Sequence, residues 1–306
     1  MKESKVLSEP GLTPEQILTE LSVVRDTQPV EALAAADLHR EALTNPLVQG
    51  ILRGLQDPAG SSENDATLFS YAMYLLAKWR ERRAYPLMVR WLSLPGEGAF
   101  EIGGDTVTQE GSRFLASTCG GDLEPIKALI LNREANEYSR SQAVEALALL
   151  AAWGELPYES VVDYFLWLAR EGLEREPSNA WNSLAANCAD IEALAVFPDL
   201  RRAYEQGLIE SLYMQPSELD EVEAEPRGKE IRVFGSTISR SPMWPARRAG
   251  GRASTANAPE RCNGWRSGRD TSPANVPRRT EHRRRLDGTA PCPCGSGKKY
   301  KKCCGA

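Results

Sequence analysis

Long apolar runs, histidines and alternating β-branched residues are all scarce in this sequence of 306 residues. No window holds eighteen uninterrupted apolar residues, so the sequence predicts no membrane-spanning helix. The opening MKESKVLSEPGLTPEQ lacks the apolar core of a secretory signal, which favours a cytoplasmic protein. Because β-branched residues seldom alternate with polar ones, no sheet of any size is expected. The hydrophobic fraction of 42% is still typical of a globular protein with a substantial core.

Residue types and motifs on which enzymes depend are also rare. The sequence has two histidines: His39, in a predicted helix, and His282, within the basic run RRTEHRRR. Neither HExxH nor GxSxG is present, and no GxGxxG follows a strand. The tryptophans Trp153, Trp167 and Trp181 recur at helical spacing, so we expect them to pack in the core. The sequence therefore predicts a protein that is not an enzyme.

The net charge of −5 conceals two oppositely charged parts. Residues 240–306 hold 12 arginines and four lysines against four acidic residues, a net charge of +12. The 239 residues before them hold 21 basic and 38 acidic residues, a net charge of −17. The chain is thus an acidic body with a basic tail, and such a tail attracts phosphate backbones, acidic partners or the chain's own body.

Residues 1–60 carry helix signals and are predicted to form N-terminal helices. Thr13 stands where an N-cap is expected, Pro14 takes the first helical position and Gln16 the third, which is the pattern of a capping box. The sequence DPAGSSEND at 57–65 then breaks the helical pattern.

Residues 61–234 are predicted to form a body of helix pairs. In DATLFSYAMYLLAKW, the first segment of the first pair, six residues at steps of three and four fall on one helical face: Leu68, Tyr71, Ala72, Leu75, Leu76 and Trp79. The second segment of each pair begins at or near a proline, and successive prolines of this set are 32 to 41 residues apart: Pro86, Pro125, Pro157 and Pro198. This period is close to that of HEAT-like helical repeats, in which stacked helix pairs bury one core. An irregular all-α bundle is the alternative.

One glycine-rich stretch, PGEGAFEIGGDTVTQEG at 95–111, stands out within the body. Its four acids are candidates for a cation, ligand or hydrolase site: Glu97, Glu101, Asp105 and Glu110. The stretch lacks the D-x-[DN]-x-[DN]-G order of a calcium loop. We therefore expect a flexible, solvated connection here.

The composition changes abruptly after residue 234. Residues 235–290 contain three Ile, Leu or Val residues and no lysine, but many arginines, glycines, serines and prolines. Such a segment buries too little apolar area to offset its ordering entropy, so we predict a disordered linker. Because its composition differs so strongly from that of its neighbours, a shifted reading frame is a second explanation.

Cysteine is rare until the last fifteen residues. Cys119 and Cys188 lie in predicted helices, where we expect buried small side chains, and Cys262 lies in the linker. The other four are packed into CPCGSGKKYKKCC: Cys292, Cys294, Cys303 and Cys304. Four thiolates at this spacing can fill the closed tetrahedral shell of a structural Zn²⁺ ion.

The residues between these thiols suit a zinc module over 291–306. Gly295 and Gly297 permit the tight backbone that follows the first pair. Four lysines offset the negative charge of the thiolates and are candidate contacts to a partner or a phosphate: Lys298, Lys299, Lys301 and Lys302. Because so short a segment has almost no core, the ion would supply most of its folding free energy, about 10–16 kcal/mol. Disulfides would need an oxidising compartment, and the phosphate-loop string GxxxxGK[ST] is incomplete.

The string CPCGSGKKYKKCC resembles the SEC-C zinc motif, which is found at the C-terminus of the SecA preprotein translocase and of many unrelated bacterial proteins. The resemblance implies one structural Zn²⁺ ion held by the four cysteines, with Cys304 where SecA usually has histidine. In SecA the motif contacts the chaperone SecB and the ribosome, so the resemblance also implies docking. The Walker motor of SecA is absent, which excludes a translocase ATPase.

The body has a resemblance of its own. The stretch GDLEPIKALILNREANEYSRSQAVEALALLAAWGELPYESVVDYFLWL, with the glycine-rich stretch before it, is similar to the bacterial domain-of-unknown-function family 1186. The resemblance covers roughly residues 30–235 and implies a helical fold. Members often end in a SEC-C motif, and the family implies no catalytic residue.

Together these features predict a cytoplasmic, non-catalytic zinc-binding adaptor. An all-α, HEAT-like body and a tethered zinc module would each contact a protein partner of the chaperone or ribosome type. The first alternative is a nucleic-acid or ribosome-associated protein that uses its basic tail, with an affinity that falls steeply with salt. The lesser alternative is an uncharacterised hydrolase with its site in 95–111.

Overall fold

The computed structural model describes residues 11–56, 62–225, 227–228, 231 and 234–235, all of which belong to one compact unit. These residues form thirteen α-helices, joined by loops and short 3₁₀ and π turns, and they include no β-strand. The all-α class predicted from the sequence is confirmed. None of the helices in these ranges is both long enough and apolar enough to cross a membrane.

Three helices begin the fold: α1 (Pro14–Ser22), α2 (Val30–Leu38) and α3 (Arg40–Gln56). The predicted capping box is present on α1. The Thr13 hydroxyl accepts a hydrogen bond from the Gln16 backbone N–H, and the Thr13 backbone N–H donates to the Gln16 side chain over 2.8 Å. Ile17 and Leu21 are fully buried, and they pack α1 against the rest of the body.

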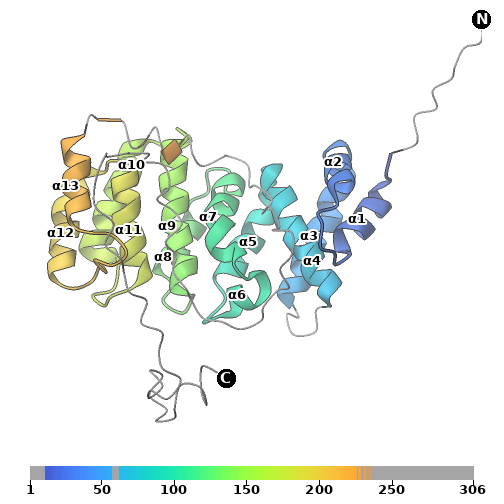
Figure 1. The fold of residues 1–306 in the computed structure, drawn as a ribbon, viewed down its shortest axis with the longest axis horizontal. Helices are drawn as coiled ribbons and strands as arrows, with labels where there is room; N and C mark the ends of the chain where they lie inside the picture. Colours follow the sequence, from blue (N-terminus) through green and yellow to red (C-terminus); the bar gives the residue numbers. More distant parts are fainter. Residues whose placement is uncertain (1–10, 57–61, 226, 229–230, 232–233, 236–306) are drawn as a thin grey trace, which may run out of the picture. The chain divides into compact units, whose positions relative to one another are not determined.

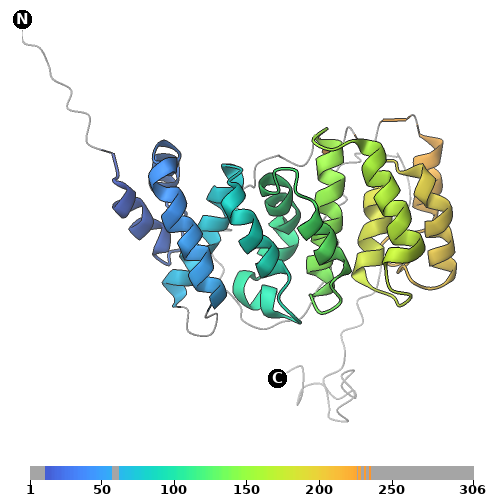
Figure 2. The ribbon, with the colours of Figure 1, turned by 180° about the vertical axis from the view of Figure 1, so that it is seen from behind.

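Four helix pairs follow in chain order, each beside the next (Figures 1 and 2). They are α4 (Glu63–Lys78) with α5 (Tyr85–Leu92), α7 (Thr106–Thr118) with α8 (Glu124–Leu131), α9 (Glu137–Ala152) with α10 (Tyr158–Trp167), and α11 (Asn179–Asp190) with α12 (Phe197–Glu205). The short helix α6 (Gly98–Gly103) precedes α7, and α13 (Ser217–Ala224) follows the last pair. The four prolines lie in the first turn of the second helix of each pair or just before it, as predicted.

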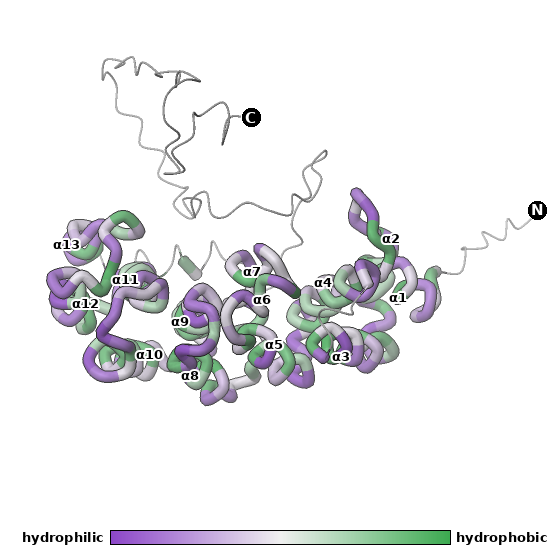
Figure 3. Tube along the Cα trace, turned by 90° about the horizontal axis from the view of Figure 1, so that it is seen from below, coloured by the Kyte–Doolittle hydropathy of each residue, from purple (hydrophilic) through white to green (hydrophobic). Residues whose placement is uncertain are grey.

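The paired helices form two rows, which Figure 3 shows along the helix axes. The first helices of the pairs, α4, α7, α9 and α11, make one row, and α5, α8 and α10 make the other, while α12 lies at the end of the body against the turns that follow α10 and α11. Helix α9 is buried on almost every side because α7, α8, α10 and α11 all pack against it. One apolar core runs from Ile17 on α1 to Leu219 on α13. Helix pairing is therefore established, whereas a HEAT-like repeat remains a prediction.

One prediction about a helix face is wrong. On α4 the predicted face is buried or half-buried, and Phe69, Met73, Tyr74 and Ala77 are buried in addition, because α1, α3 and α7 surround this helix. Trp167 is not in the core: its side chain is 39% exposed and stacks on Tyr164, with ring centroids 5.5 Å apart. The other two tryptophans singled out in the sequence are buried, as predicted.

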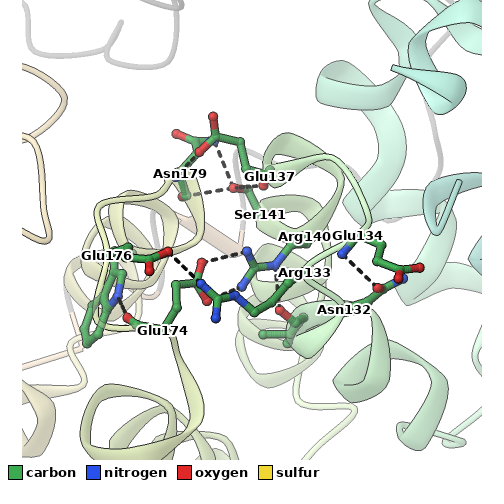
Figure 4. A network of polar contacts seen from close by, with 11 residues as sticks. Asn132, Arg133, Glu134, Glu137, Arg140, Ser141, Glu174, Glu176 and Asn179 are labelled. Atoms are coloured by element: carbon green, nitrogen blue, oxygen red, sulfur yellow. Dashed lines mark hydrogen bonds and ion pairs between the residues drawn. The ribbon is translucent and has the colours of Figure 1, made fainter. Parts of the chain in front are cut away.

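Polar contacts join α9 to the loop that precedes α11 (Figure 4). The Arg140 guanidinium donates to both carboxylate oxygens of Glu174, and its Nε donates to the Ile130 carbonyl oxygen over 2.9 Å. The Glu137 carboxylate accepts a hydrogen bond of 2.6 Å from the Asn179 backbone N–H. These contacts fix the third helix pair to the fourth.

The chain returns to the body after α13. The Gly228 backbone N–H donates to the Glu192 carboxylate over 2.5 Å, and Ile231 and Phe234 pack against the core. At Gly235 a Cβ atom would lie 3.0 Å from a backbone carbonyl oxygen of α9. The last described residues therefore end beside α9.

Candidate functional site

The whole predicted zinc module, 291–306, lies outside the part of the chain that the structure describes. The four tail cysteines, the four lysines between them, Cys262 and His282 all lie outside the described residues. Their roles remain predictions from the sequence.

The two cysteines of the body behave as predicted. Cys119 and Cys188 are buried free thiols. Burial raises the pKa of both thiols, that of Cys188 well above its ordinary value. Since the thiolate is the reactive form, neither residue suits nucleophilic chemistry. His39 is partly buried at the junction between α2 and α3.

The flexible connection expected at 95–111 is wrong, because most of this stretch is helical. Two of its glycines allow close packing. A Cβ atom at Gly103 would lie 2.2 Å from the Trp91 ring, and one at Gly111 would lie 3.0 Å from the Gln142 side chain. Gly104, with φ of +52°, ends α6 in the left-handed region. A glycine-rich sequence that is typical of a loop therefore forms parts of two tightly packed helices.

The four acids of this stretch do not converge on one site. Glu97, Glu101 and Asp105 are exposed, and Glu97 accepts a hydrogen bond from the Asn136 side chain over 2.9 Å. Glu110 is instead buried within the row of first helices. In the part of the chain that the structure describes, no group of three or more His, Cys, Asp or Glu side chains is arranged to hold a metal ion.

Glu110 belongs to a group of carboxylates contributed by three successive helices, which we call the carboxylate cluster: Glu110 of α7, Glu145 of α9 and Asp190 of α11. Arg113 forms an ion pair with one oxygen of Glu110, while the other oxygen is buried without a hydrogen-bond partner. Gln142 links two of the helices, since its side chain accepts from the Ser112 backbone N–H over 3.1 Å and donates to Glu145 over 3.4 Å.

The surroundings of Glu110 and Glu145 favour the protonated forms of these two side chains. Burial raises the pKa of Glu110 to about 7, opposed by Arg113 and assisted by the charge of Glu145. Burial and the charge of Asp190 likewise raise the pKa of Glu145 to about 7. Glu110 and Glu145 therefore exchange protons near neutral pH. The chemistry of the cluster suits a site that changes charge, and it offers neither a nucleophile nor a metal shell.

Sequence reasoning missed Glu145 and Asp190. A usable signal existed for the first, because Glu145 is the lone charged residue in the apolar run AVEALALLAAW. A charge in such a run is rarely buried without a partner. Asp190 carried no such signal, since its neighbourhood depends on how α11 packs beside α9.

Comparisons with known proteins place the chain among bacterial relatives. Residues 12–233 match the family model described as "Protein of unknown function (DUF1186)", and residues 289–306 match the SEC-C motif. Uncharacterized proteins of Chlamydia trachomatis and Chlamydia muridarum are each 30% identical over 207 residues, which cover 67% of this chain and 82% and 83% of theirs. No solved structure matches the chain.

The tail has a relative of a different kind. The protein translocase subunit SecA of Syntrophus aciditrophicus is 66% identical over 35 residues, which make up 11% of this chain and 4% of SecA. The body match begins at residue 12, earlier than the residue 30 expected from the sequence, because α1 shares the core of the later helices. Both predicted resemblances are confirmed: the chain belongs to the DUF1186 family and carries a SEC-C motif at residues 289–306.

Proposed function

We propose that the protein is a non-catalytic adaptor that binds one structural Zn²⁺ ion through Cys292, Cys294, Cys303 and Cys304. In this proposal the helical body contacts one protein surface and the zinc module contacts another. The observation that carries it is the SEC-C match at 289–306, which includes all four cysteines. Linking two contacts by one chain raises the effective concentration of the second contact.

The donor set of the tail fits zinc. The chain supplies four thiols within thirteen residues, which is enough for a closed structural shell and leaves no open position for a substrate. The lysines between the thiols favour the thiolate form that the metal requires. The 56 residues from 236 to 291 separate the first of these thiols from the end of the body at Gly235. A segment of this length lets the module reach a surface well away from the body.

On the body, the exposed stack of Trp167 on Tyr164 supports a protein contact. Trp and Tyr are enriched among residues that dominate binding energies. Lys127 of α8 lies 5.3 Å from the Tyr164 ring and adds a positive charge beside the aromatic pair. This surface is the part of the body that we expect a partner to cover.

Zinc content and thiol protection test the metal site. We expect one Zn²⁺ ion per chain by elemental mass spectrometry, with the four tail thiols protected from alkylation until a chelator is added. C292S/C294S should lose the ion, whereas the matched variant C262S should keep it. A substoichiometric ion with all four tail thiols alkylated at once would contradict the proposal.

Affinity capture tests the adaptor role. Wild type and C262S should retain a protein partner that C292S/C294S loses. W167A should weaken capture through the body, and L212A is the control because Leu212 is also exposed and apolar. Identical sets of captured proteins for all four variants and wild type would exclude docking by either surface.

A role in nucleic-acid binding is the second candidate, and the charge division favours it. The net charge of +12 in residues 240–306 suits contact with a phosphate backbone. RNA should then bind the full chain at low salt and dissociate at high salt, and deletion of 240–306 should abolish this binding. RNA affinity that is unchanged by salt or by the deletion would exclude this function.

A further inference from the structure

A hollow lined by arginines lies between the end of α10 and helix α12. It has a volume of about 480 Å³. Its lining comes from η2 (Leu168–Gly172), a π turn that continues α10, from Arg175 in the loop after η2, and from the α12 segment. Single π turns inside helices occur frequently at functional sites. Three arginines, one aspartate, one glutamine and two alanines line the hollow.

The charged groups of the hollow are unbalanced. Asp199 is almost fully buried, and its carboxylate accepts contacts from Arg170 at 3.2–3.3 Å and from Arg202. Arg175 is the third guanidinium in the lining. Because Asp199 is the sole acid among the lining residues, the hollow carries a net charge of +2.

The arginines are held in place rather than free to turn away. Arg175 donates to the carbonyl oxygens of Ala169 and Arg170, and its guanidinium lies 5.7 Å from the Trp181 ring. Asp199 holds the side chains of Arg170 and Arg202. Positioned guanidiniums lose less conformational entropy on binding than free ones, which favours recognition of a small ligand.

Donors remain available toward the open side. Each guanidinium has five N–H groups, and the contacts of Arg170 and Arg202 with Asp199 use only some of them. The side chains of Arg170 and Arg202 are 54% and 58% exposed, so a ligand can reach the remaining donors. Planar forks of N–H groups match the oxygens of a phosphoryl group in pairs.

We propose that this hollow binds the phosphoryl group of a small phosphorylated molecule. The net charge of +2 balances a phosphate dianion. A volume of about 480 Å³ also accommodates a small organic group beside the phosphate, and it lies within the range of ligand sites. The site does not depend on zinc or on the adaptor role.

Titration calorimetry with inorganic phosphate on the full chain tests the proposal. R170Q/R202Q should bind phosphate at least tenfold more weakly than wild type. R201Q is the matched control: Arg201 is the neighbour of Arg202 and pairs instead with Asp220 and Glu223 of α13. Because every variant retains the basic tail, the difference between them reports on the hollow alone.

The double variant leaves the buried Asp199 carboxylate without partners and lowers stability for that reason. D199N/R170Q/R202Q removes this carboxylate as well, so it should fold like wild type and still lose phosphate binding. Equal phosphate affinity of wild type, R201Q and a folded triple variant would overturn the proposal. Malonate at matched ionic strength tests the ligand class: it should bind more weakly than phosphate, and equal binding would overturn the assignment to a phosphoryl group.

Discussion

Arg140 and Glu174 form an ion pair with two parallel hydrogen bonds of 2.7 Å, and their side chains are only 5% and 6% exposed. The pair joins α9 to the loop before α11 (Figure 4). Burial alone would raise the pKa of Glu174, but the hydrogen bonds and charge of Arg140 hold it at about 2. The carboxylate is therefore ionised throughout the neutral pH range.

Breaking this pair should destabilise the body strongly. E174Q leaves the Arg140 charge buried without a counter-ion, so we expect the free energy of unfolding to fall by about 3–5 kcal/mol. R140M/E174L removes both charges, so it should lower the free energy of unfolding by less than E174Q does. Urea denaturation measures all of these values.

The exposed pair Arg133–Glu176 supplies the control on the same loop, since its side chains are 60% and 74% exposed. R133M should change the free energy of unfolding by less than about 1 kcal/mol. If R133M and E174Q lowered the free energy of unfolding equally, burial of the Arg140–Glu174 pair would not be the cause of the loss.

The carboxylate cluster should make stability fall as pH rises. The folded pKa of Glu145 is about 7, whereas its ordinary value is 4.5. At a pH between these two values, the folded state therefore keeps a proton on Glu145 that the unfolded state has released. Its stabilising contribution is complete below pH 4.5 and is lost as pH rises through about 7.

E145Q tests this dependence. It should raise the free energy of unfolding at pH 8 by about 1–2 kcal/mol, less than the full pKa shift implies because the side chain is partly exposed. The pH profile between 4.5 and 7 should also become flatter. E101Q, at an exposed position on α6, should leave the profile unchanged. A parallel profile for wild type and E145Q would show that Glu145 ionises normally.

The helix pairs were predictable because their signals are local. A capping box at Thr13 and prolines at the starts of second helices act within one helical turn, and the sequence displays them directly. The helical state of 95–111 was not predictable in this way. Its glycines indicate a loop locally, but Gly111 contacts Gln142, 31 residues away. Only the packing of α7 on α9 reveals this contact.

The two candidate sites differ in the same way, since one is local in the sequence and the other is assembled by tertiary contacts. The tail cysteines lie within thirteen residues, so their chemistry can be read from spacing. Arg170 and Arg202 are 32 residues apart, on separate segments, and their convergence on Asp199 depends on how η2 packs against α12. Sequence patterns therefore predict the local motif and miss the sites that tertiary contacts assemble.

Gly103 offers a direct test of the close packing of α6. A Cβ atom there would lie 2.2 Å from the Trp91 ring, whose Nε1 donates to the Ala99 carbonyl oxygen over 2.9 Å. Because Trp91 is fully buried, the ring has little room to move. We expect G103A to lower the free energy of unfolding by about 1–3 kcal/mol.

G11A is the comparison for this substitution, because a Cβ atom at Gly11 would meet nothing within 4 Å. It should leave the urea midpoint unchanged. A G103A protein as stable as wild type would mean that α6 shifts away from Trp91 at little cost.

Deletion of 288–306 separates the proposed zinc module from the stability of the body. The described core runs from Ile17 to Leu219. If the module is tethered only by the segment after Gly235, its removal takes no packing from the helices. The melting temperature of the body should then shift by less than about 2 °C, the change expected for under 1 kcal/mol in a domain of this size.

Addition of a chelator to the full chain should likewise leave the helical melting transition in place while releasing zinc. A fall of many degrees in either experiment would mean that the tail docks on the acidic body, and its partner contacts would then compete with an intramolecular one.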